Sequence, residues 1–143
     1  MTRRPTPKPT EAELAILHIL WARGASTVRQ IHDLLYRDQA SYTTSLKLLQ
    51  IMFGKGLVVR DDSQRAHIFQ AAVSQDETQA DFVSDVLRRV FKGSSSQLVL
   101  HALGSAPPAT AEELADIRTL LDRIEKGETG SDTANHKAKK NKD

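Results

Sequence analysis

The segment 42-YTTSLKLLQ-50 carries hydroxyl, ammonium and amide groups at a spacing that brings them to one side of a helix. At about 100° per residue these groups, which belong to Thr43, Thr44, Lys47 and Gln50, lie away from the leucines of the same segment. Such side chains hydrogen-bond to base edges and phosphates, and threonine is small enough to let a helix lie deep in the DNA major groove. Any solvated helix also presents a polar face, so the interpretation depends on the elements around it.

The histidines do not form a pattern of metal ligands or catalytic groups. They are His18, His32, His67, His101 and His136, no two of them have the HxH or HExxH spacing, and the chain contains no cysteine. No serine lies in a motif in which a neighbouring base would activate it. We therefore expect no metal site, no cofactor, no catalytic residue and no enzymatic activity.

Positive charge is concentrated in the first half of the chain. Residues 1–73 contain ten Lys and Arg against six Asp and Glu, residues 74–126 contain six against nine, and residues 127–143 contain four against three. A polyanion is therefore expected to meet the first half. No apolar run is long enough to span a membrane, and no apolar stretch follows the basic N-terminus as in a signal peptide. We predict a cytoplasmic protein with no membrane partner.

The polar segment belongs to the third of three short helices. The predicted helices span about residues 10–24, 28–37 and 42–55; Thr10 and Glu13 form a capping box at the start of the first, and Gly56 ends the third. Two β-prone runs follow, 57-LVVR-60 and 66-AHIFQA-71, with the polar turn 61-DDSQR-65 between them. Three helices and a hairpin, in this order, are typical of a winged helix-turn-helix, whose third helix enters the major groove while the hairpin wing lies along the backbone.

Three further helical segments follow this hairpin. The first starts at Ser74 and is broken by 93-GSSS-96, a short apolar helix covers residues 97–103, and the last begins after Thr110 with a coiled-coil-like spacing of apolar residues. This C-terminal helical unit is short and has little chain of its own against which to bury its apolar stripes. We therefore expect a second copy of the protein to cover them. The expected dimerisation residues are Phe82, Val86, Val90, Leu98, Leu114, Ile117, Leu121 and Ile124.

The sequence thus predicts a mainly α protein, with an N-terminal winged helix-turn-helix and a C-terminal helical dimerisation domain. The expected boundaries are a flexible basic arm over residues 1–9, the winged-helix domain over 10–73, the dimerisation domain over 74–126 and a disordered tail over 127–143.

The sequence resembles the penicillinase-repressor family. The resemblance is carried by 10-TEAELAILHILWARGASTVRQIHDLL-35, 42-YTTSLKLLQ-50, 55-KGLVVR-60 and 65-RAHIFQAAVS-74, in this order and at these spacings. It implies a homodimeric transcriptional repressor that binds an inverted-repeat operator in double-stranded DNA. By position, Thr43, Thr44 and Lys47 match the family's major-groove face, and Arg60, Arg65 and His67 match its wing, where phosphate contacts are expected.

Two positions depart from the family pattern. Many members have a basic residue where this chain has Ile51, so either affinity is lower or a thymine methyl meets the isoleucine. In the penicillinase branch a membrane sensor-protease pathway cleaves the repressor at an Asn-Phe pair, which here is replaced by His101-Ala102. Induction by the same cleavage specificity is therefore not expected. The cysteine cluster of the copper-responsive branch is excluded.

The leading hypothesis is a dimeric DNA-binding repressor. The expected DNA contacts are Thr43, Thr44, Lys47, Gln50, Ile51, Lys55, Arg60, Arg65 and His67. One alternative is a winged-helix protein-interaction module that docks a partner through Ile51. The other is a regulator that responds to a small molecule bound at a dimer interface.

Overall fold

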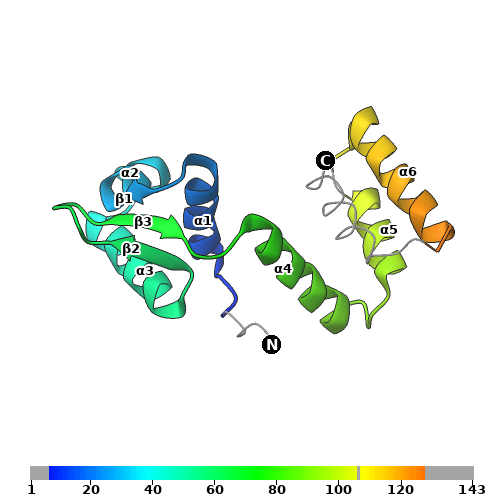
Figure 1. The fold of residues 1–143 in the computed structure, drawn as a ribbon, viewed down its shortest axis with the longest axis horizontal. Coiled ribbons are helices and arrows are strands. Elements are labelled where there is room, and N and C mark those ends of the chain that lie inside the picture. Colours follow the sequence, from blue (N-terminus) through cyan, green and yellow to red (C-terminus); the bar gives the residue numbers. More distant parts are fainter. Residues whose placement is uncertain (1–6, 106, 128–143) are drawn as a thin grey trace, which may run out of the picture. The chain divides into compact units, whose positions relative to one another are not determined.

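The computed structural model describes residues 7–105 and 107–127, and Figure 1 shows the order of the helices and strands. The chain divides into two compact units, with the break after Gly93. The elements are α1 (Glu11–Arg23), β1 (Ser26–Thr27), α2 (Val28–Leu35), α3 (Tyr42–Lys55), β2 (Val58–Asp61), β3 (Ile68–Ala71), α4 (Gln75–Arg89), α5 (Ser95–Ser105) and α6 (Ala111–Glu125). The predicted fold class, a mainly helical chain with an N-terminal winged helix, is confirmed.

Local capping chemistry determines where the helices begin and end. Thr10 opens α1 with a complete capping box, in which its hydroxyl accepts from the N–H of Glu13 and its own N–H donates to the Glu13 carboxylate. Thr27 opens α2 in the same way with Gln30. Gly56 ends α3 at φ 81°, a left-handed conformation that favours glycine. The predicted ends of the first and third helices are confirmed.

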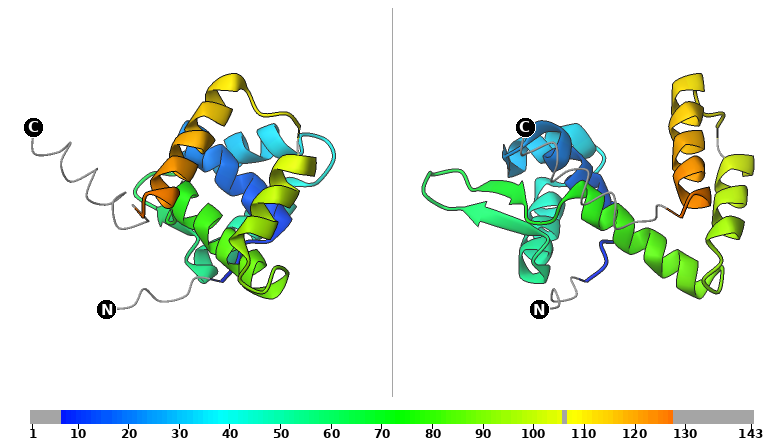
Figure 2. Two further views of the ribbon diagram at one scale, coloured as in Figure 1. Left: turned by 90° about the vertical axis from the view of Figure 1, so that its right-hand side faces the viewer. Right: turned by 45° about the vertical axis from the view of Figure 1, so that its right-hand side comes forward.

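The hairpin is part of a three-stranded antiparallel sheet in the order β1-β3-β2. The wing register pairs Val58 with Ala71 and Arg60 with Phe69. The two-residue strand β1 pairs with β3 on its other side, Ser26 opposite Phe69. Figure 2 shows the hairpin extending beyond α1, α2 and α3, so its turn is free to reach a ligand.

The core of the first unit lies between the three helices and the sheet. Phe69 of β3 is buried and belongs to one cluster with buried residues of α1, α2, α3 and β2. The buried apolar residues are Ile16, Leu17, Leu20, Val28, Ile31, Leu49, Met52, Leu57, Val58 and Phe69. Removing a large buried side chain from such a set costs about 2–5 kcal/mol.

A charged pair is buried beside this core. Glu13 is 1% exposed, and its two carboxylate oxygens lie 2.9 and 3.0 Å from Nζ of Lys55. Burial raises the pKa of Glu13, but the hydrogen bonds from Thr10 and Lys55 and the charge of Lys55 outweigh it and hold the pKa below 4.5. The start of α1 is thus tied to the end of α3.

Contacts from the N-terminal segment and α1 fix α4 in the first unit. The indole N–H of Trp21 donates to the carbonyl of Val73 at 2.9 Å, just before α4 begins. Lys8 forms an ion pair with Asp85 of α4, and its ammonium lies 4.9 Å from the ring centroid of Phe82. The hydrogen bond from Lys8 is the main reason that the pKa of Asp85 lies below its usual value.

The helices α5 and α6 contain no buried side chain. Both helices belong to the second unit, and Leu98, Leu114 and Ile117 are half-buried. Their exposed apolar residues are Val99, Leu100, Leu103, Leu120, Leu121 and Ile124. His101 and Ala102 lie within α5. No helix in the described part of the chain combines the length and apolar character needed to cross a bilayer.

The predicted domain boundaries stay predictions. We assigned α4 to a dimerisation domain that begins at residue 74, whereas in the structure α4 belongs to the first compact unit. Residues 1–6 of the predicted arm and residues 128–143 of the predicted tail lie outside the described residues.

The buried pair predicts how stability depends on pH. Because the folded-state pKa of Glu13 lies below its ordinary value of 4.5, its stabilising contribution is present above pH 4.5 and is lost as the pH falls through the folded-state pKa. We expect Glu13→Gln to lower the free energy of unfolding by about 2 kcal/mol at pH 7 and to flatten the loss of stability on acidification. Urea unfolding at fixed protein concentration, followed by Trp21 fluorescence, measures both.

Glu11→Gln is the matched control, because Glu11 lies in the same first turn and is exposed. It should change the stability by less than about 0.5 kcal/mol. Equal effects of the two substitutions would show that the pair with Lys55 contributes nothing beyond surface charge.

Candidate nucleic-acid interface

The polar face of α3 is exposed as the sequence analysis expected. Thr43, Lys47 and Gln50 are exposed, whereas Ser45, Leu49 and Met52 are buried on the side that faces the core. Ser41 caps the helix, since its hydroxyl accepts from the N–H of Thr44. The hydroxyl of Thr44 is exposed and also lies 3.1 Å from that of Ser41, so it belongs to the cap as well as to the polar face.

Ile51 places an apolar group on the same face. It is 43% exposed and lies one helical turn after Lys47. An exposed isoleucine gains nothing from water, so an apolar surface on a ligand would stabilise it.

Lys55 is directed away from this face. Its ammonium is bound to the Glu13 carboxylate, and its side chain is 30% exposed. The charge of Lys55 is therefore already balanced within the protein, unlike that of Lys47, for which the described residues supply no carboxylate partner.

Two of the three predicted wing residues, Arg60 and His67, form a small network around Asp62. Nε of Arg60 lies 2.8 Å from Oδ1 of Asp62, and Nδ1 of His67 lies 3.5 Å from the same atom. The guanidinium of Arg60 also stacks over the ring of Phe53 on α3, 4.6 Å from its centroid. This stacking connects the wing to α3, and Arg60 and His67 share one carboxylate oxygen of Asp62.

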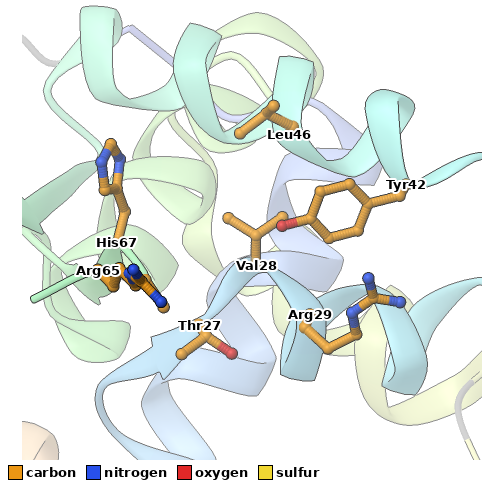
Figure 3. Close-up of a pocket in the computed structure, with 8 residues that line it drawn as sticks. Thr27, Val28, Arg29, Tyr42, Leu46, Arg65 and His67 are labelled. Carbon is orange, nitrogen blue, oxygen red and sulfur yellow. The ribbon is translucent and has the colours of Figure 1, made fainter.

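A depression of about 260 Å³ lies between the start of α2, the start of α3 and the wing. Figure 3 shows Arg65 and His67 on one side of it and Arg29 and Tyr42 on the other, with Val28 between them. Its lining residues include these two arginines and no carboxylate. Tyr42 and Leu46 line it from α3 and immediately precede Thr43 and Lys47 in the chain, so the depression borders the polar face.

Arg29 is the one charged residue lining the depression that was not among the expected DNA contacts. Its guanidinium lies 4.8 Å from the ring centroid of Tyr42, which holds the second position of α2 against the first position of α3. One feature of the sequence could have indicated a role for Arg29 in anion binding. It lies in the first turn of a helix capped by Thr27, and that turn contains no acidic residue.

The helix starts at this surface also carry an electrostatic signature. The first turns of α2 and α3 contain no acidic residue, whereas α1, α4 and α6 each have acidic residues there. Acidic residues normally balance the positive end of the helix dipole. The two helices that border the depression therefore leave that positive end available to an anion.

Three helices, a hairpin wing and an exposed polar third helix define a winged helix-turn-helix protein of the DNA-binding class. The penicillinase repressor family matches residues 9–123. The chain therefore belongs to the penicillinase repressor family, and it is a transcriptional repressor with a winged-helix DNA-binding fold.

Curated relatives agree with this assignment. The chain is 31% identical over 119 residues to the transcriptional regulator BlaI of Mycobacterium tuberculosis, in strains CDC 1551 and H37Rv alike, and the match covers 82% of this chain and 85% of each relative. Among solved structures, a cysteine-to-serine mutant of Lactococcus lactis ZitR aligns over 90% of this chain and 81% of its own, with 16% identity and a TM-score of 0.37. That similarity is too low to support an argument.

The Asp62 network generates a prediction about DNA affinity. In Asp62→Asn the side chains of Arg60 and His67 lose the carboxylate between them and become available to phosphates. We expect tighter binding to DNA of any sequence, with the slope of log affinity against log salt steeper by about 0.9. Fluorescence anisotropy titrations at several salt concentrations measure both quantities.

Asp116→Asn on α6 is the control, because it removes the same unit of charge from an exposed position outside the first unit. A change of slope in Asp116→Asn as large as in Asp62→Asn would attribute the effect to net charge. Unchanged slopes in both would show that the Asp62 network does not face DNA.

Proposed function

We propose that the protein binds an inverted-repeat operator as a homodimer, with α3 in the major groove and the wing along the phosphate backbone. The observation that carries this proposal is the exposed row of Thr43, Lys47 and Gln50 beside a depression lined by arginines and free of carboxylates. Only a ligand with polar edges and regularly spaced anions matches both features, and duplex DNA is such a ligand.

The side chains then divide into base contacts and phosphate contacts. Thr43, Thr44, Lys47 and Gln50 reach base edges, and Ile51 contacts a thymine methyl, the apolar group that the major groove offers. Arg65 and Arg29 bind phosphates from the two sides of the depression, with the positive end of α2 between them. Lys55 holds the end of α3 through its ion pair with Glu13 and makes no direct contact with DNA.

The proposed dimer rests on the state of α5 and α6. No side chain of α5 or α6 is fully buried, so a large part of their apolar surface stays in water within one chain. A second copy of the same stripe covers it with matching spacing. A twofold dimer also places two copies of α3 with the symmetry of an inverted repeat.

The individual apolar residues support this assignment to different degrees. Leu121 and Ile124 are each 49% exposed, and Val90 of α4 is 67% exposed. Leu98, Leu114 and Ile117 are half-buried. Phe82 is half-buried as well and contacts Lys8 of its own chain. The predicted dimerisation residues that leave most apolar surface exposed are therefore Val90 at the end of α4 and Leu121 and Ile124 on α6.

The base contacts and phosphate contacts predict different effects of mutation. Thr44→Ala and Lys47→Ala should weaken operator binding about tenfold while changing binding to unrelated DNA less, because base contacts are lost. Arg65→Ala should weaken binding to all sequences alike and make the salt slope shallower by about 0.9. Gel-shift titrations against the operator and a scrambled duplex measure the difference. Unchanged operator affinity in both α3 variants would contradict the assignment of α3.

The proposed dimer predicts how substitutions on α6 change self-association. Ile124→Glu puts a charge into the apolar seam of α6, so we expect dimer dissociation to increase by about two orders of magnitude. Thr119→Glu is the matched control, because Thr119 lies on the opposite side of α6 from that seam and is exposed. Sedimentation equilibrium measures both. An Ile124→Glu protein that stays dimeric at the wild-type affinity would place the interface elsewhere.

A further inference from the structure

His32 is a buried polar residue that none of the roles above includes. It lies on α2 and is 5% exposed, in the same core as Ile31. Its Nδ1 lies 2.7 Å from the hydroxyl of Ser45 on α3, and its Nε2 lies 3.0 Å from the carbonyl oxygen of Arg37 in the turn between α2 and α3. The imidazole therefore connects α2, the turn and α3.

The two partners determine the proton position on the ring. A carbonyl oxygen can only accept, so Nε2 carries the hydrogen and donates to Arg37. Nδ1 is then the acceptor and receives the hydroxyl hydrogen of Ser45, which is 0% exposed. With this arrangement both ring nitrogens have a partner, and the loss of either partner would leave a buried polar group unpaired.

These bonds act on the two features that set the direction of α3. Arg37 adopts φ 42°, a left-handed conformation rarely taken by residues other than glycine, and it reverses the chain after α2. Ser45 lies on the buried side of α3, within two residues of Thr43, Thr44 and Lys47 on the exposed side. A rotation of α3 that moved these side chains would have to break the bond to His32.

Apolar contacts at the same place are less directional. Leu49 and Met52 hold α3 against the core, but packing of this kind has no fixed donor–acceptor axis. The ring of Tyr42, the first residue of α3, lies 5.9 Å from that of His32 at 73°, so the start of the helix is held on the same residue. The polar bonds add a defined rotation to a helix that packing alone would position more loosely.

We propose that His32 is a positioning residue for sequence recognition, which fixes the rotation of α3 through Ser45 and the Arg37 carbonyl so that Thr43, Thr44 and Lys47 meet the bases in register. This inference rests on the proposed function of α3 as the recognition helix. Its contribution is to operator specificity, since phosphate contacts by Arg65 do not pass through α3.

The test compares His32→Leu with His32→Asn, because leucine and asparagine have nearly the same shape. Asparagine places an amide oxygen near the position of Nδ1 and can accept from Ser45, whereas leucine cannot. At a temperature where urea titrations show both to be folded, we expect the leucine variant to lose operator affinity about tenfold and the asparagine variant to lose about threefold or less. Binding to scrambled DNA should change by less than about twofold in both, because it depends mainly on phosphate contacts.

Ser45→Ala completes the comparison. It should reproduce the loss of specificity, and in the His32→Leu background it should cause no further loss, because the bond is already absent. Thr78→Val is the control for a buried hydroxyl: Thr78 is 6% exposed and donates to the carbonyl of Ser74 on α4, away from α3. It should lower stability and leave the ratio of operator to scrambled-DNA affinity unchanged.

Amide hydrogen exchange gives a readout without DNA. In His32→Leu we expect the amides of residues 44–48 to exchange faster relative to residues 49–55 than they do in His32→Asn. Equal operator affinity and equal exchange in the two folded variants would overturn the proposal while leaving the recognition helix intact. A wild-type protein without operator preference would instead overturn the proposed function, and the exchange rates would then show whether His32 still orders α3.

Discussion

The winged-helix unit depends on one carboxylate that is kept charged in the protein interior. Burial opposes the ionised form of Glu13, and the ammonium of Lys55 together with the capping bonds at Thr10 reverses that preference. Removing a single partner would leave an uncompensated buried charge. That costs more stability than replacing both partners by apolar residues. The wing begins directly after α3, and Leu57 and Val58 at its start are both buried, so it starts close to this ion pair in the chain.

Two polar contacts hold α3, one near each end. The bonds between His32 and Ser45 act near its start, those between Glu13 and Lys55 act at its end, and Leu49 and Met52 pack between them. Both contacts lie off the face that carries Thr43 and Lys47, so that face is left for a ligand. The wing differs from α3, since its Arg60 pairs with the exposed carboxylate of Asp62, which water screens and a phosphate can replace.

Features that depend on local chemistry were predictable from the sequence, and those that depend on distant partners were not. Capping residues and Gly56 gave the helix ends, because a cap needs only its own first turn. The two-residue strand β1 was missed, since too short a run carries no periodicity and it exists only because β3 passes beside it. Lys55 was expected to contact DNA and Arg29 was not singled out, because neither Glu13 nor Tyr42 is a neighbour in sequence. The Lys55 ammonium points toward Glu13 because α1 packs beside the end of α3, and this packing is not visible in the local sequence.

The contact between Trp21 and Val73 has a consequence for the order in which the protein forms during synthesis. The two residues are 52 positions apart, Glu13 and Lys55 are 42 apart, and Lys8 and Asp85 are 77 apart. Each joins an early helix or the segment before it to chain that leaves the ribosome much later. The first helix can therefore pack early against α2, but it completes these three contacts only when the wing and the start of α4 have left the ribosome.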